Sequence, residues 1–143
     1  MKITAYHLQD TISLFGRVLI ALIFIVAGFN KIINFSDAAA YITSRGLAYP
    51  SVIAFLAIIF ELGGGLMVFL GWKARVGACM LFIFTIPVTF IFHSFWSVEP
   101  TVTTNLTQNL IRNFSIMGAT LYLIAYGAGN FSFDGRRHKM HPQ

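Results

Sequence analysis

The sequence predicts an all-helical (all-α) integral membrane protein, a four-helix bundle of up-down-up-down topology with short loops. Hydrophobic residues make up 57% of the chain and charged residues only 10%, whereas soluble domains carry about a quarter charged residues. The apolar residues also gather into four runs near the ~20 residues that cross a bilayer, at about 12–33, 51–71, 76–96 and 109–126. These runs use most of the 143 residues, so we expect a single transmembrane domain, 1–143.

The first run carries two cations on one helical stripe. Arg17, Ala21, Phe24, Gly28 and Lys31 recur at alternating spacings of four and three residues. Such spacings place side chains on one face of a helix. Both cations are therefore expected to face the same neighbouring helix.

The second run holds a single carboxylate near its middle. Ala54, Ala57, Glu61, Gly64 and Gly65 share one helical face, so the acid lies on the side with the smallest residues. A charge at this depth costs at least ~2.5 kcal/mol on insertion scales, and we expect a partner on a closely packed helix. Two interpretations stay open: a structural buried ion pair, or an acid that handles protons or binds a ligand.

Arg17 is the expected partner of Glu61 in this buried ion pair. The two residues differ in depth by about five residues of helical rise, or ~7 Å. A long guanidinium side chain can cover that gap. If the two do not meet, Glu61 is expected to face a cavity or another cation such as Lys31.

Polar residues are also predicted to converge at the outer mouth of the bundle. His93 closes the third run, and Arg112 and Asn113 lie near the start of the fourth, at the depth of Lys31. Cations, an amide and an imidazole in an apolar wall suit a small polar or quinone-like ligand, so these four are the candidate ligand-binding residues. Glu61 and His93 are the candidate catalytic residues, because both can exchange protons. A histidine at a helix end can equally be structural.

Basic residues predict the orientation of the chain. The formal net charge is +5, but the cations are scattered between apolar runs and form no single face, so we expect no nucleic-acid partner. Six lysines and arginines lie in the termini and the middle loop, against three on the other side. This bias predicts that both termini are cytoplasmic.

The sequence offers no motif for a metal or a haem. Cys79 is the only cysteine, which excludes an internal disulfide and a CxxC redox centre. His93 is the only histidine within the four runs, whereas bis-histidine haem ligation requires a pair. Any redox chemistry therefore needs another carrier.

Two segments outside the runs also carry structural signals. Residues 37–43 can form a short helix at the membrane surface, ended by Gly46. Residues 127–129 form a glycine-rich helix exit. The cationic tail that follows, from Arg136 to His141, is expected to be mobile.

Taken together, these residues resemble the DoxX family of small four-helix membrane proteins over nearly the whole chain. The matching stretches are Gly16-Arg17, 24–28 with Lys31, 61–66 with Gly71 and Arg75, His93, Arg112-Asn113 with Gly118, 127–129 and 132–134. The family takes its name from a membrane subunit associated with thiosulfate oxidation that feeds electrons to quinone. Other members look like membrane partners of soluble enzymes that handle superoxide or sulfur compounds. The resemblance implies a multi-pass inner-membrane protein with redox associations.

Three functions stay open at this point. The first is a membrane subunit of a quinone-associated redox system for thiosulfate, other sulfur compounds or oxidative stress; whether the chain is itself part of a quinone-linked oxidoreductase enzyme is left open. The second is a non-catalytic assembly subunit. The third is a small-molecule or proton pathway along Arg17, Glu61 and His93, which needs oligomerisation to leave room for a pore. The expected partners are the lipid bilayer, a soluble or membrane redox protein, and further copies of the chain.

Overall fold

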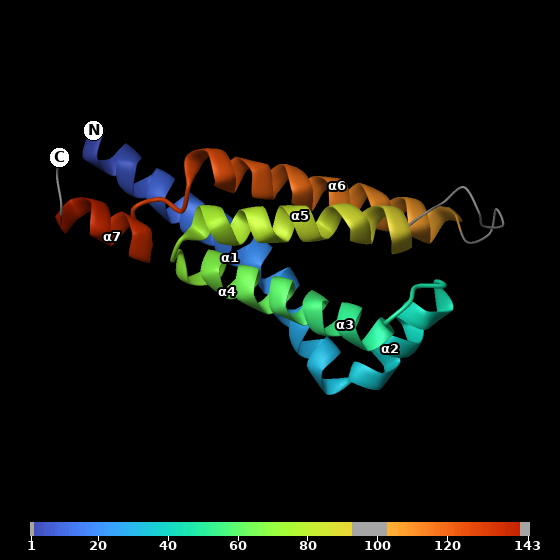
Figure 1. The fold of residues 1–143 in the computed structure, drawn as a ribbon. Coiled ribbons are helices and arrows are strands. Elements are labelled where there is room, and N and C mark those ends of the chain that lie inside the picture. The colour runs from blue at the N-terminus through green and yellow to red at the C-terminus, as the bar shows by residue number, and fades with distance from the viewer. Residues whose placement is uncertain (1, 93–102, 141–143) are drawn as a thin grey trace.

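The computed structural model describes residues 2–92 and 103–140, and these ranges fold into helices joined by short turns. The all-helical membrane bundle predicted from the sequence is confirmed (Figure 1). In chain order the elements are α1 (Lys2–Ile33), α2 (Phe35–Ser44), α3 (Pro50–Ile58), η1 (Ile59–Gly63), α4 (Gly64–Leu70), α5 (Ala74–Phe92), α6 (Thr103–Tyr126) and α7 (Phe133–Met140). η1 is a π-helical turn that joins α3 and α4 into one continuous helix.

Within residues 2–92 and 103–140, three helical segments are long and apolar enough to cross a membrane, namely His7–Ile33, Pro50–Leu70 and Ala74–Phe92. They correspond to the first three predicted runs, the third of which is described only as far as Phe92. α6 covers the fourth run and packs along α5 (Figure 1). Its first turns are rich in threonine, asparagine and glutamine, and it is not among the three apolar segments. A fourth membrane crossing therefore stays a prediction.

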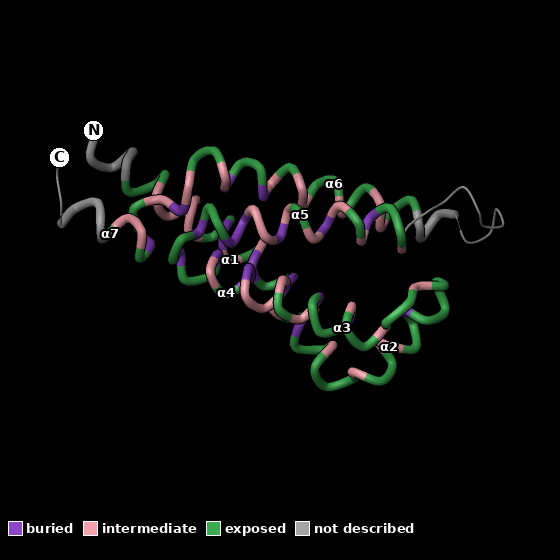
Figure 2. The backbone as a smooth tube through the Cα atoms, in the orientation of Figure 1, coloured by how far each residue is buried: buried purple, intermediate pink, exposed green. Residues whose placement is uncertain are grey.

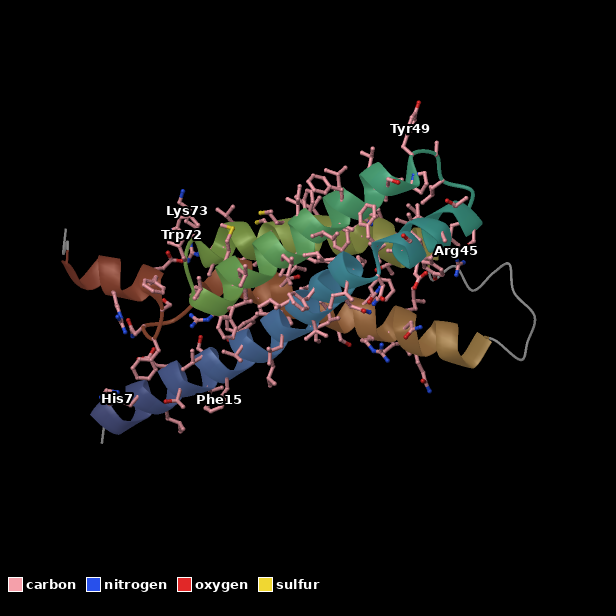
Figure 3. The ribbon with its side chains drawn as sticks, turned by 90° about the horizontal axis from the view of Figure 1, so that it is seen from below. His7, Phe15, Arg45, Tyr49, Trp72 and Lys73 are labelled. Carbon is pink, nitrogen blue, oxygen red and sulfur yellow. The ribbon has the colours of Figure 1, made fainter. Side chains whose placement is uncertain are left out.

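Each long helix packs against the long helix that follows it in the chain. α1 packs against the continuous α3–η1–α4 helix, which packs against α5, which in turn packs against α6. α7 and the beginning of α1 lie at one end of the molecule, and α2 lies at the other (Figure 1). The side-chain view places Trp72 and Lys73 at the end that holds His7, whereas Arg45 and Tyr49 lie at the α2 end (Figure 3).

The buried positions follow the two predicted faces (Figure 2). On α1, Arg17, Ala21, Phe24 and Gly28 are buried and Lys31 is half-buried. On the second helix the buried set is Ala54, Ala57, Glu61, Gly64, Gly65 and Val68. A side chain at Gly28 would collide with Leu62, so the small residues bring the two helices close together as predicted.

Two segments outside the long helices are also described. The predicted short helix at 37–43 is confirmed as α2, which is followed by Gly46 with a φ of 74°. α7 includes most of the cationic tail, as far as Met140, and the mobility expected of the tail stays a prediction. Asp134, in the first turn of α7, accepts hydrogen bonds from the backbone amides of Lys73 and Ala74 at 2.8 and 2.9 Å. These bonds fasten the segment to the start of α5.

Candidate functional site

Glu61 forms an ion pair with Lys31. The Lys31 ammonium Nζ donates to both Oε1 and Oε2 of the carboxylate, each at 2.9 Å. The Glu61 side chain is 7% exposed and that of Lys31 is 31% exposed. The carboxylate is thus compensated, as expected, but the predicted pairing of Arg17 with Glu61 is wrong.

The position of α2 explains why the partner is Lys31. α3 packs mainly against α2 and less against α1, whereas η1 and α4 pack against α1 (Figure 1). The last turn of α1, with Lys31, lies level with Glu61, and a Cβ added at Gly28 would lie 3.3 Å from the Glu61 Cβ. Arg17 is fourteen residues before Lys31, which is about 21 Å along a helix. If the first two long helices formed a simple hairpin without α2, the residue of α1 level with Glu61 would not be Lys31.

Glu61 lies in the middle of the π-helical turn η1. Single π-helical turns within α-helices are rare and are frequent at functional sites. Small residues are buried on both sides of it, namely Ala54 and Ala57 before Glu61, and Gly64 and Gly65 after it. The spacing of apolar residues carried no signal for this turn.

A cavity of about 200 Å³ adjoins the ion pair. Its lining residues come from α1, α2, α3, η1 and α5. Apart from the ion pair and the phenol of Tyr41, its walls are apolar. The lining residues are Lys31, Ala38, Tyr41, Ile42, Ile53, Ala57, Glu61, Phe84, Val88 and Phe92. The arrangement places one charged pair against an apolar, partly aromatic space inside the membrane protein.

Two of the aromatic walls are held by stacked neighbours. Phe84 stacks on Phe60 with ring centroids 6.0 Å apart, and Phe92 stacks on Tyr41 at 5.4 Å. Arg45 donates a hydrogen bond to the Tyr41 hydroxyl at 2.9 Å and lies over its ring. No motif in the sequence marks these aromatic residues as site residues. The spacing of Phe84, Val88 and Phe92, four residues apart on α5, was the available signal.

Of the predicted outer-mouth residues that the structure describes, Lys31 lines this cavity, whereas Arg112 and Asn113 do not. Asn113 donates a hydrogen bond to the Thr89 hydroxyl at 3.1 Å and so joins α6 to α5. Arg112 is exposed, and neither residue is part of the cavity lining. His93 lies outside the described residues, and its predicted role stays a prediction. Among the residues that the structure describes, no three His, Cys, Asp or Glu side chains form a group that could hold a metal ion.

Arg17 belongs to a separate polar cluster at the other end of the molecule. Its guanidinium donates to the backbone carbonyls of Ala128 and Phe131 at 2.9 and 3.0 Å. A larger space of about 690 Å³ lies beside it, between α1 and α6. Arg17 lines this space, but the residue is only 2% exposed and both terminal nitrogens of its guanidinium are bonded to backbone carbonyls. We therefore place the candidate site at Lys31 and Glu61.

The fold and the site define a small helical membrane protein that holds a charged pair beside an apolar cavity. The family model DoxX matches residues 12–94 of the chain, and the chain belongs to the DoxX family. It is 31% identical over 128 residues to inner membrane protein YphA of Escherichia coli K12, covering 90% of this chain and 91% of that protein. It is equally identical to inner membrane protein YqjF of the same organism, over 127 residues, 89% of this chain and 92% of that protein.

A more distant similarity connects the chain to a eukaryotic protein. A Surfeit locus protein 4 homolog from Schizosaccharomyces pombe is 36% identical over 73 residues, which is 50% of this chain and 24% of that protein. No solved structure matches the chain. The geometry of the site therefore comes from this chain alone.

Proposed function

We propose that this protein lies in the inner membrane and binds the head group of a quinone in the cavity beside Lys31 and Glu61, as the membrane subunit of a redox-linked system. One observation carries the proposal, namely a charged pair exposed to an otherwise apolar cavity within the bundle. Ligand sites characteristically combine apolar walls with a few placed polar groups. The names of the two bacterial relatives support the location, and the resemblance to the DoxX family supports the redox association.

The chemistry of the cavity suits a ring that carries carbonyl oxygens. A lysine ammonium has three N–H donors, and Lys31 directs bonds to the two carboxylate oxygens of Glu61. One donor therefore remains for a ligand. Phe84 and Phe92 provide apolar aromatic surface on the α5 side, against which a flat ring can stack. Glu61 keeps the ammonium in position.

The proposal is tested by filling the cavity. Ala38 lines it, so Ala38→Phe places a ring inside, whereas Ala40 on the same helix is exposed and not part of the lining. Wild type and both variants are purified in mild detergent, extracted with organic solvent, and assayed for quinone by mass spectrometry. We expect quinone with wild type and Ala40→Phe, and loss of most of it with Ala38→Phe. Equal quinone in both variants, or none in wild type, contradicts the proposal.

A second candidate function is that of a non-catalytic assembly subunit. The observation that favours it is that Lys31 and Glu61 satisfy each other without a ligand. In that case the wild-type protein copurifies with no small molecule, and Ala38→Phe leaves any association with a partner protein unchanged.

A further inference from the structure

We infer that the end of the molecule that holds α7 binds an anionic phospholipid. The Arg136 guanidinium donates to the lipid phosphate, and Leu70 and Phe133 contact the acyl chains. This surface lies at the opposite end of the molecule from α2 (Figure 1). The inference does not depend on the proposed function of the cavity beside Lys31 and Glu61.

A depression at the α7 end combines one cation with an apolar wall. Its lining residues are Leu14, Leu70, Asn130, Phe131, Ser132, Phe133 and Arg136. Leu70, Phe131 and Phe133 are exposed large hydrophobic residues. Arg136 follows Phe133 by three residues in α7, a spacing that places two side chains on the same face of a helix. An amphiphilic molecule can therefore contact the apolar wall and the guanidinium at the same time.

The other polar side chains of the depression are bonded within the protein. The Ser132 hydroxyl accepts a hydrogen bond from the Gly135 backbone amide at 2.9 Å. The Asn130 side-chain amide donates to both Asp10 carboxylate oxygens, each at 3.1 Å. Arg136 is exposed, and its guanidinium makes no hydrogen bond or ion pair with any residue that the structure describes. The polar group left for a ligand is thus a guanidinium, whose planar fork matches the oxygens of a phosphate.

The charges around the depression favour an anionic ligand. Among the side chains that the structure describes at this end, the cations are Arg17, Lys73, Arg75 and Arg136, and the carboxylates are Asp10 and Asp134. Both carboxylates accept hydrogen bonds within the protein, one from Asn130 and the other from the first backbone amides of α5 and the residue before it. The cations outnumber the carboxylates, and a cationic surface beside a membrane attracts anionic head groups.

The depression lies where two membrane segments end. Leu70 is the last residue of the apolar segment Pro50–Leu70, and the next apolar segment begins at Ala74. In the turn between them Trp72 is exposed, and the Lys73 ammonium lies 5.5 Å from the centroid of its ring (Figure 3). Tryptophan and lysine are typical of the membrane–water interface. A lipid of the surrounding leaflet can therefore reach both Leu70 and Arg136, whereas a free phosphate cannot use the apolar wall.

The test compares two lipids that share their acyl chains, anionic phosphatidylglycerol and zwitterionic phosphatidylcholine. The delipidated full-length protein in mild detergent is titrated with each lipid, and the bound lipid is counted by native mass spectrometry. We expect wild type to bind phosphatidylglycerol about fivefold or more tightly than phosphatidylcholine, and Arg136→Gln to remove most of this preference. Arg112→Gln is the matched control, because Arg112 is also exposed but is not part of the depression. Its preference should equal that of wild type.

A second pair of variants tests the apolar wall. Phe133→Ser removes a ring that contacts the acyl chains, so it should weaken the binding of both lipids and leave the preference between them unchanged. Phe114→Ser is its control, since Phe114 is 49% exposed against 54% for Phe133 and is not part of the depression. Both lipids should bind Phe114→Ser as they bind wild type.

Four outcomes contradict the inference. Equal binding of the two lipids to wild type overturns the anionic selectivity. An equal loss of preference in Arg136→Gln and Arg112→Gln overturns the location, because the effect would then come from the net charge of the protein. Displacement of phosphatidylglycerol by an equal concentration of inorganic phosphate would identify a site for a free anion and not for a lipid. Unchanged binding of both lipids to Phe133→Ser overturns the role of the apolar wall.

Discussion

The ion pair between Lys31 and Glu61 predicts a strong energetic coupling between the two residues. It also predicts that the two single substitutions lower the free energy of unfolding by different amounts. Lys31→Met leaves a carboxylate that is 7% exposed without its partner, and breaking a buried pair in this way costs about 3 kcal/mol. Glu61→Gln leaves an ammonium that is 31% exposed and can reach toward water, so its cost is smaller, about 1 kcal/mol. In the Glu61→Gln background, Lys31→Met removes no partner and should cost little. The coupling energy is therefore about 2 kcal/mol or more.

This coupling is measured by unfolding the purified variants with sodium dodecyl sulfate in mixed micelles, followed by circular dichroism. The matched control is a second cycle between Arg17→Met and Glu61→Gln. Because Arg17 bonds to Ala128 and Phe131 at the other end of the molecule, its effect should add to that of Glu61→Gln within about 0.5 kcal/mol. Additivity in the Lys31 cycle, or coupling in the Arg17 cycle, refutes the observed pairing.

Three further predictions concern the remainder of the fold. Gly71→Ala should destabilise the protein by more than Gly46→Ala in the same unfolding assay, because both glycines have positive φ but only at Gly71 does a side chain collide with the buried guanidinium; equal losses contradict the close packing. Asp134→Ala should cost about 1 kcal/mol by removing the cap of α5, and an unchanged midpoint would show that the cap contributes nothing. Reporter fusions after Ser44 and after Gln143 should report opposite sides of the membrane, with the second in the cytoplasm; the same side for both rules out the predicted topology.

The faces of the first two long helices could be predicted because burial repeats with the helical period. Arg17 and Lys31 mark the ends of the α1 stripe, and Glu61 lies on the small-residue face of its helix as expected. The partner of Glu61 could not be predicted in the same way. It depends on the position of α2, which sets the residue of α1 that lies level with Glu61. The spacing of residues within either long helix carries no information about that position.

The partners of Arg17 could not be predicted from the sequence either. They are backbone carbonyls of the loop after α6, more than a hundred residues away, and a carbonyl acceptor has no residue type by which it could be recognised. The role of Asp134 could not be predicted either, because the backbone amides that it caps belong to a helix that begins sixty residues earlier. The glycines at 127–129 predicted a helix exit, but the segment that follows is fixed by tertiary contacts.

The most direct test of the candidate site is to map where a photoreactive quinone binds. The full-length protein in nanodiscs is irradiated with an azido-benzoquinone, digested, and analysed by mass spectrometry, with an excess of the unreactive benzoquinone as competitor. We predict competable labels on the cavity lining of α2 and α5, at Tyr41, Phe84 or Phe92. Competable labels confined to the space between α1 and α6, at residues such as Ser13 or Tyr122, would contradict the assignment of the site to Lys31 and Glu61.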